Sequence, residues 1–125
     1  MFQIDKFARM PIYEQIIEQA ERMIVTGVLA PDAQLPSVRV LSQTLSVNPN
    51  TLQKAYAELE RRGVTYSVPG NGRFVAKDAV EKLSAQTERY LAEIAEIAEK
   101  LALAGISIEN VYRTVDRAYG KEEQE

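Results

Sequence analysis

The chain has 125 residues, of which 46% are apolar and 26% charged, and its formal net charge is −3. It contains no Cys and no His, which excludes disulfides, thiolate nucleophiles, Cys-ligated zinc and the commonest general base. Because no apolar run approaches the ~18 residues of a membrane span and the first residues carry no signal-peptide pattern, we expect a cytoplasmic protein with one core, no membrane partner, no cofactor and no metal.

A first helix is predicted to begin at Pro11, which suits a first turn, and to end at Gly27. Apolar residues recur along one face of this helix. They are Ile12, Ile16, Ala20, Met23 and Ile24. Two prolines in the following segment, residues 30–36, predict a loop.

Two more helices follow, separated by a tight turn. Ser37 is a good N-cap for a short helix with apolar residues Val38, Leu41 and Leu45. Asn48 is a good N-cap for the next helix, Pro49 suits its first position, and Gly63 terminates it. The apolar stripe of this helix has the spacing i, i+3, i+4, i+7. It consists of Leu52, Ala55, Tyr56 and Leu59.

Residues 64–67 and 73–76 are predicted to be two strands around a Pro-Gly-Asn-Gly turn. A helix-turn-helix followed by a hairpin is typical of a winged helix-turn-helix. The fold class expected for the chain is therefore mainly α with a small β-hairpin. We expect the core of this part to contain Ile16, Leu41, Leu45, Leu52, Leu59 and Phe74.

From residue 78 the pattern changes to a heptad seam of about three repeats. The seam runs through Leu83, Thr87, Tyr90, Ile94, Ile97, Leu101 and Ala104. Gly105 breaks this helix, Ser107 can cap a last one, and Gly120 ends it. One short helix cannot cover so long a seam, and an exposed apolar patch marks an interface. We therefore expect a homodimer whose interface includes Leu83, Tyr90, Ile94, Ile97 and Leu101.

These patterns divide the chain into three parts. Residues 1–77 are expected to form the winged helix-turn-helix, residues 78–120 a helical dimerisation region, and residues 121–125 a disordered tail. Charge follows the same division. Residues 37–77 carry six Lys or Arg against two Asp or Glu, whereas residues 78–125 carry six against eleven. The basic segment coincides with the predicted helix-turn-helix, as attraction to DNA phosphate requires.

The helix after Asn48 begins with small hydrogen-bonding side chains on its polar side. Those expected to contact DNA are Asn48, Asn50, Thr51, Gln53 and Lys54. Asn and Gln pair with adenine edges, Thr contacts phosphate or the thymine methyl, and Lys contacts phosphate or guanine. The alternative interpretation is an ordinary solvated helix face.

Two further groups extend this predicted DNA surface. Ser37 and Arg39 open the preceding helix, where they can meet the phosphate backbone. The turn of Gly70, Asn71 and Gly72, with Arg73 beside it, can approach a minor groove because glycine permits close backbone contact. Taken alone, the turn is an ordinary hairpin turn.

The motifs Pro11-Ile12-Tyr13-Glu14-Gln15-Ile16, Leu35-Pro36-Ser37-Val38-Arg39 and Asn48-Pro49-Asn50-Thr51 resemble, in order and spacing, the winged-helix domain of the GntR family of bacterial transcriptional regulators. Two helices after the wing are similar to the small YtrA subfamily. The resemblance implies a homodimeric repressor of its own or neighbouring genes, often genes for ATP-driven transporters. It also implies that Tyr13 belongs to the DNA-binding surface, and that Thr65 stands where a larger aliphatic residue is usual.

Three classes of function are compatible with a small winged helix-turn-helix protein: a DNA-binding regulator, a protein-interaction module and an enzyme. A sequence-specific regulator that binds double-stranded DNA, on a palindromic operator, is favoured. A winged-helix protein-interaction module is the alternative, but it does not need these polar residues gathered on one surface. An enzyme is disfavoured because the chain offers no His, no Cys and no phosphate-binding glycine motif. The sequence does not identify the operator, the target genes or any small-molecule effector.

Overall fold

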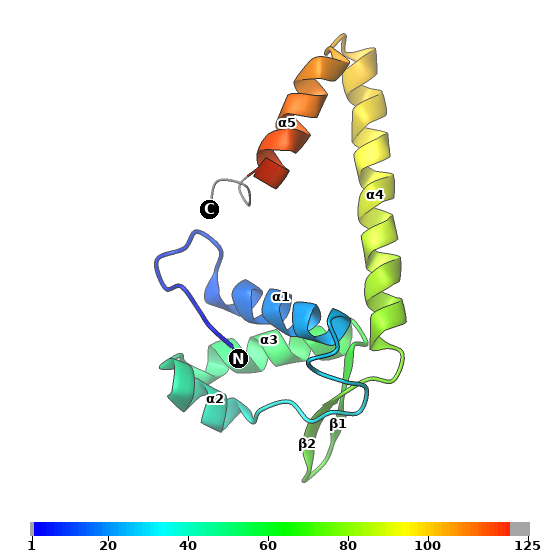
Figure 1. Ribbon diagram of the computed structural model, residues 1–125. Helices are drawn as coiled ribbons and strands as arrows, with labels where there is room; N and C mark the ends of the chain where they lie inside the picture. Colours follow the sequence, from blue (N-terminus) through cyan, green and yellow to red (C-terminus); the bar gives the residue numbers. More distant parts are fainter. Residues whose placement is uncertain (1, 121–125) are drawn as a thin grey trace. The chain divides into compact units, whose positions relative to one another are not determined.

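The computed structural model describes residues 2–120, which form two compact units that divide after Ala85 (Figure 1). Unit 1 extends to Ala85 and unit 2 begins at Gln86. The elements are α1 Ile12–Val25, α2 Val38–Leu45, α3 Pro49–Arg61, β1 Thr65–Val68, β2 Gly72–Val75, α4 Ala79–Leu103 and α5 Ile108–Gly120. The predicted fold class, mainly α with a small hairpin, is confirmed. No helix within residues 2–120 is long and apolar enough to span a membrane.

The core of unit 1 is built around α3, which packs against both α1 and α2. All four residues of the predicted α3 stripe are buried, and on α1 the buried apolar side chains are Ile16, Ile17, Ala20 and Ile24. The largest side chains that are fully enclosed are Tyr56, Ile16, Leu52, Leu59, Val64 and Val75. The 3.6-residue periodicity of these segments therefore places one face of each helix in a common core.

Hydrogen-bonding side chains define the starts of α2 and α3, as predicted. The Ser37 hydroxyl accepts from the backbone N–H of Val40 at 3.1 Å, and the Asn48 side-chain oxygen accepts from the backbone N–H of Asn50 at 2.8 Å. Between the two helices, Ser46 adopts the left-handed conformation with φ of 55°. These local features set the angle at which α3 leaves the turn.

The two strands lie closer to the loop than predicted: β1 begins and ends one residue later, and β2 one residue earlier. Thr65 pairs with Val75 and Val68 pairs with Gly72, so the connecting loop consists of Pro69, Gly70 and Asn71. Successive strand residues point to opposite faces, so Phe74 and Val75 lie on different faces of the hairpin.

The prediction that Phe74 belongs to the core is wrong. Val75 is the β2 residue that is fully buried, whereas Phe74 lies on the outer face of the hairpin and stacks on Tyr66, with ring centroids 5.6 Å apart. The Tyr66 hydroxyl in turn donates to the carboxylate of Asp32 at 2.8 Å. A cross-strand aromatic pair thus stabilises the exposed side of the wing.

The segment predicted as a loop between α1 and α2 also contributes to the wing. The backbone N–H of Asp32 donates to the carbonyl of Val75 at 2.8 Å, and the N–H of Leu35 donates to the carbonyl of Arg73 at 2.9 Å. Gln34 forms an isolated antiparallel bridge with Phe74. The outer edge of β2 is therefore paired along most of its length, which fixes the hairpin against the start of α2.

An ion-pair cluster joins the C-terminal end of α3 to α1. Arg61 and Arg62 both donate to the carboxylate of Glu58, and Arg62 also donates to Glu21 on α1 at 2.9 Å. The hydrogen bonds from Arg61 and then Arg62 lower the pKa of Glu58 to about 2. These arginines therefore already have carboxylate partners within unit 1.

Helix α4 begins inside unit 1, where Ala79 and Leu83 are buried in the core. This corrects the assignment of Leu83 to the dimer interface, because its side chain already packs within its own chain. The remainder of α4 belongs to unit 2, together with α5. Of the residues described in α5, none is buried. The predicted disordered tail, residues 121–125, lies outside the described residues.

Thr65 offers a test of the core of unit 1. The residue is 4% exposed, and its hydroxyl has no hydrogen-bond partner among the residues that the structure describes. Replacing a buried, unpaired hydroxyl by a methyl group of similar size removes a desolvation cost, so Thr65→Val is expected to raise the free energy of unfolding by about 1 kcal/mol. Urea denaturation followed by circular dichroism measures the change. The m-value, the slope of the free energy of unfolding against urea concentration, should stay constant.

Thr44→Val is the matched control. Its hydroxyl is exposed and donates to the carbonyl of Val40 at 2.9 Å, so this substitution should give no gain. A Thr65→Val variant no more stable than wild type would show that the hydroxyl is satisfied in solution.

Candidate nucleic-acid interface

The start of α3 combines a capped helix end with exposed polar side chains. Asn50, Gln53 and Lys54 are exposed, whereas Thr51 is half-buried. Asn48 uses its side-chain oxygen for the cap. Because Leu52 and its neighbours occupy the buried face, the exposed groups are fixed on the opposite side and cannot rotate into the core. The arrangement leaves two amides and one ammonium free to bind an external partner.

Lys54 is held in place by an aromatic neighbour. Its ammonium lies 4.0 Å from the centre of the Tyr13 ring, in a cation–π contact between α3 and α1. Tyr13 itself is half-buried at the start of α1. The contact thus brings together two predicted site residues that are far apart in the sequence. It also holds the Lys54 ammonium on the exposed side of α3, next to α1.

Arg39 lies in the first turn of α2, two residues after the Ser37 cap. It is exposed, and its guanidinium makes no hydrogen bond or ion pair with any residue in the described part of the chain. Ser37 uses its hydroxyl as an acceptor toward Val40, and a hydroxyl can donate as well. This end of α2 therefore carries one unpaired guanidinium and one available O–H donor.

A hollow separates the wing from the start of α2. Its lining includes Ser37 from α2, Tyr56 from α3, and Asn71, Gly72 and Arg73 from the hairpin. Four predicted site residues from two separate segments are thus brought together. The side chain of Gln34 spans the same region. Gln34 donates to the carbonyl of Asn71 at 2.7 Å, tying the wing loop to the segment before α2.

The backbone conformation of Gly72 favours glycine at this end of the wing loop. Its φ is 111°, which side-chain-bearing residues rarely adopt, and a Cβ atom there would lie 2.8 Å from the amide nitrogen of Gln34. Gly70 also has a positive φ, 80°, but the space around it is open. The two glycines therefore have different functions: one permits close packing and the other permits the turn.

The side chain of Arg73 lies against α3. Its guanidinium lies 5.6 Å from the centre of the Tyr56 ring, and its Nη1 atom is buried without a hydrogen-bond partner among the described residues. Burial raises the pKa of Tyr56, and the charge of Arg73 opposes that shift. In this conformation Arg73, which pairs with Ser67 near the loop end of the hairpin, braces the wing against α3.

Sequence reasoning treated Tyr56 as a core residue and overlooked Gln34. The Tyr56 ring is buried, but its hydroxyl donates to the carbonyl of Pro36 at 2.8 Å and so joins α3 to the start of α2. A signal was present for Tyr56, because a buried tyrosine needs a partner for its hydroxyl. No local pattern marked Gln34, whose role depends on a contact 37 residues away.

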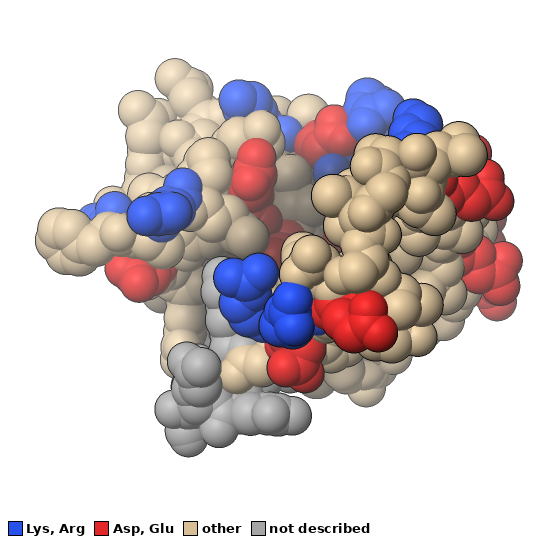
Figure 2. All heavy atoms as spheres, turned by 90° about the horizontal axis from the view of Figure 1, so that it is seen from above, with Lys and Arg blue, Asp and Glu red and all other residues tan. Residues whose placement is uncertain are grey.

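Basic side chains do not dominate the whole surface. On the face shown in Figure 2, Lys and Arg side chains are interspersed with Asp and Glu, and neither sign forms one large patch. Within residues 2–120 no group of three or more His, Cys, Asp or Glu residues is placed to hold a metal ion. The excess of positive charge is confined to the segment that forms the helix-turn-helix and the wing.

Comparison with known proteins agrees with this geometry. Residues 12–75 match the family model described as bacterial regulatory proteins, gntR family. The HTH-type transcriptional repressor YtrA of Bacillus subtilis is 36% identical over 119 residues, covering 92% of this chain and 89% of the relative. This match extends through both units, whereas the family model covers unit 1 alone.

Solved structures give the same result. A GntR family transcriptional regulator from Listeria monocytogenes has a TM-score of 0.64 and 34% identity, covering 91% of this chain and 98% of that chain. The AraR DNA-binding domain in complex with operator ORX1 has a TM-score of 0.52 and 36% identity, covering 61% of this chain and 93% of that chain. The sequence match, the shared structure and the winged helix-turn-helix together establish that this chain belongs to the gntR family of bacterial regulatory proteins.

Proposed function

We propose that the protein is a homodimeric repressor that binds a palindromic operator through the winged helix-turn-helix of residues 1–77. The observation that carries the proposal is the capped start of α3, which exposes Asn50, Gln53 and Lys54 together on one side. Recognition helices of this motif contact base edges through their N-terminal residues. The structurally similar AraR DNA-binding domain has been solved in complex with an operator, which supports DNA binding by this fold.

In this proposal the residues around α3 have distinct tasks. Asn50 and Gln53 contact base edges, with Thr51 beside them, while Lys54 and Arg39 bind phosphates. Tyr13, Ser37 and the cap residue Asn48 complete the backbone contacts, since phosphate contacts set the register of a protein on its duplex. From the wing, Gly70, Asn71 and Gly72 approach the DNA, and Arg73 contacts it from β2, beside this loop.

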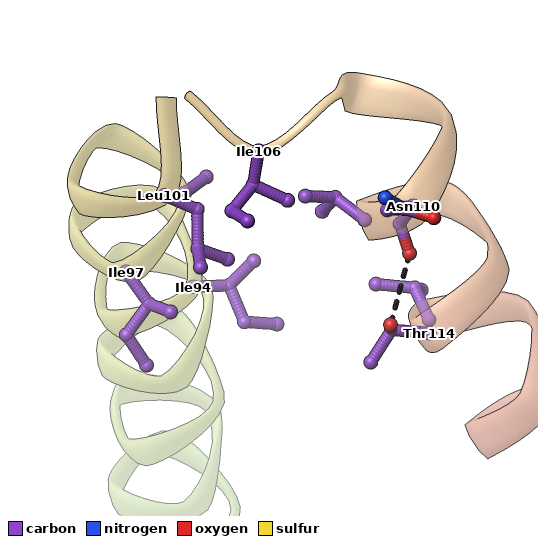
Figure 3. Close-up of a pocket in the computed structure, with 9 residues that line it drawn as sticks. Ile94, Ile97, Leu101, Ile106, Asn110 and Thr114 are labelled. Carbon is purple, nitrogen blue, oxygen red and sulfur yellow. Dashed lines mark hydrogen bonds between the residues drawn. The ribbon is translucent and has the colours of Figure 1, made fainter. Parts of the chain in front are cut away.

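Dimerisation is assigned to the helical region, residues 78–120. On α4, the side chains of Tyr90, Ile94 and Ile97 are between 52% and 55% exposed. Apolar side chains from α4 and α5, including Ile97, line a hollow within unit 2, and Figure 3 shows Ile94 and Leu101 directed toward it. Exposed apolar surface of this kind is typical of a protein interface.

A second copy of the chain is the occupant that fits this surface best. The hollow has a volume of about 280 Å³, just below the ~300–1,000 Å³ of small-molecule pockets. A heptad seam continues beyond it along α4, which suits a partner helix better than a compact ligand. A twofold dimer would present two recognition helices to two half-sites about one turn of DNA apart.

Repression and the choice of target genes are proposed from the resemblance to relatives in the family. The relative YtrA is a transcriptional repressor, and a dimer seated on an operator excludes other proteins from that DNA. We propose genes for ATP-driven transporters as the targets and the cytoplasm as the place of action. The direct test is selection from a random pool of double-stranded DNA. Enrichment of one palindromic sequence supports the proposal, whereas recovery without enrichment would favour a protein-interaction module.

Base recognition is tested on the selected duplex. Asn50→Ala and Gln53→Ala each remove a side-chain amide from the start of α3, so each should cost about 1–3 kcal/mol of binding free energy and relax base preference at one position per half-site. Fluorescence anisotropy on single-base variants of the duplex measures both effects. Gln43→Ala, which removes an exposed amide from α2, is the control. Wild-type affinity and preference in both variants would refute the assignment.

Phosphate contact is tested by salt dependence. Lys54→Ala and Arg39→Ala should weaken binding to all sequences alike, because phosphates carry no sequence information. Each should also flatten the slope of log K against log salt by about 0.9, the change expected when one phosphate is no longer neutralised by the protein. Lys100→Ala on α4 removes the same charge elsewhere. The control should keep the wild-type slope. If Lys54→Ala and Arg39→Ala keep it too, these two cations are solvated and do not contact phosphate.

The dimer is tested with Ile94→Asp combined with Ile97→Asp. Burying two unpaired carboxylates at the seam is unfavourable, so the variant should sediment as a monomer while wild type sediments as a dimer. Without linked half-sites, affinity for the palindrome should fall by about 10²–10⁴-fold. Weak binding to a single half-site should survive, because the core of unit 1 is separate.

Ala85→Asp combined with Ala92→Asp is the matched control. It adds the same charge to the opposite side of α4, about half a turn from the seam at 100° per residue. The control should remain dimeric. A monomeric wild type, or a dimeric Ile94→Asp/Ile97→Asp variant, would contradict the assignment.

A further inference from the structure

Residues 5–10 form a well-ordered loop ahead of α1, here called the N-terminal loop. The buried side chain of Gln15 holds both ends of it. Gln15 accepts from the backbone N–H of Asp5 at 2.9 Å, and donates to the carbonyls of Asp5 and Met10 at 2.9 and 2.8 Å. The Asp5 carboxylate accepts from the N–H of Phe7 at 2.9 Å. The loop is therefore held in one conformation by interactions within unit 1.

The fixed loop presents an unusual set of side chains to solvent. Phe7 is 98% exposed, more than any other large apolar side chain among the described residues. Lys6 and Arg9, on either side of it, are also exposed. Arg9 makes no hydrogen bond or ion pair within the described part of the chain. The loop thus holds one aromatic ring and two cations away from the core of unit 1.

The loop lies beside the helix-turn-helix. The ammonium of Lys6 donates to the carbonyl of Ser46 at 3.1 Å, in the turn between α2 and α3. Ser46 is two residues before the cap of α3, so Lys6 stands close to the start of the recognition helix. An ammonium has three donors, and this contact uses one of them. Lys6 can therefore bind a phosphate without releasing the loop.

The loop and the wing are placed at opposite ends of α3. The loop contacts the turn that precedes the N-terminal end of α3, whereas β1 follows its C-terminal end (Figure 1). The wing extends a DNA surface in one direction from the recognition helix. The N-terminal loop continues the same surface in the other direction.

The chemistry of the loop favours DNA over a protein partner. The cores of protein interfaces are depleted in charged residues, yet Phe7 is flanked by two cations. Of the other large apolar side chains in residues 2–10, Phe2 is buried and Ile4 is half-buried, which leaves Met10, 39% exposed, as the one exposed neighbour of this kind. DNA offers the complementary chemistry, since phosphates pair with the cations and apolar side chains insert against sugars and base steps in a minor groove.

We propose that the N-terminal loop is a further DNA-binding element. In it Lys6 and Arg9 bind phosphates outside the half-site read by α3, and Phe7 packs in the adjoining minor groove. The proposal depends on the proposed function, because it extends the same protein–DNA complex. The loop is already ordered, so binding carries little additional cost in conformational entropy.

The experiment compares two duplexes that carry the selected palindrome: one with long flanks, and one trimmed to the bases read by α3. On the long duplex, Lys6→Ala combined with Arg9→Ala should weaken binding roughly tenfold at physiological salt and flatten the salt slope by about 1.8, the value for two phosphate contacts. On the trimmed duplex, wild type should fall to the level of the variant, and the variant should lose nothing further.

Two further variants separate charge from shape. Phe7→Ala should weaken binding to the long duplex at every salt concentration while leaving the slope unchanged, because it removes no charge. Lys6→Arg combined with Arg9→Lys should restore the wild-type slope. Arg89→Ala combined with Lys100→Ala, which removes two exposed cations from α4, is the control and should behave as wild type on both duplexes.

The outcomes distinguish this proposal from the proposed function. Failure of the wild-type dimer to prefer the selected duplex over a scrambled one would defeat both. Preference for the selected duplex, with the loop variants equal to wild type on long and trimmed duplexes, would overturn the loop proposal alone. A Phe7→Ala variant that changes sedimentation but not DNA affinity would assign the ring to a protein interface and also overturn it.

Discussion

Burial of the apolar face of α3 is the constraint on which the rest of the structure depends. Leu52, Ala55, Tyr56 and Leu59 are each no more than 1% exposed, and they pack against both α1 and α2. A helix with one face enclosed in this way has a fixed rotation about its axis. The polar side chains at its start therefore have a defined direction, and their exposure is a consequence of the core. Recognition chemistry and stability are thus properties of the same helix.

Tyr56 extends this constraint beyond the core. Its hydroxyl binds the Pro36 carbonyl at the start of α2, and its ring supports the guanidinium of Arg73 on the wing. Gln34 adds a hydrogen bond to the wing loop. Three parts of the interface, the two helices of the motif and the hairpin, are therefore positioned by contacts that converge near one side chain. A rigid arrangement of this kind reduces the entropy lost on binding.

The two units differ in charge as well as in structure. The helix-turn-helix and wing are basic, whereas the helical region after residue 77 is acidic and exposes much of its apolar surface. An acidic region is repelled by phosphate, so it favours DNA binding through unit 1 alone. The formal net charge of −3 conceals this division, because it averages over parts with opposite sign.

Local sequence determined much of this protein by itself. Ser37 and Asn48 mark helix starts through short-range capping, and the 3.6-residue period identifies which helix faces are buried, because both effects operate within a few residues. Tertiary structure alone decided the rest. Strand residues alternate between faces, and the folded hairpin buries Val75, which leaves Phe74 on the other face. Leu83 fits a heptad seam but packs into its own chain, and Arg73 turns toward an aromatic ring distant in sequence, because these depend on which surfaces meet in the folded protein.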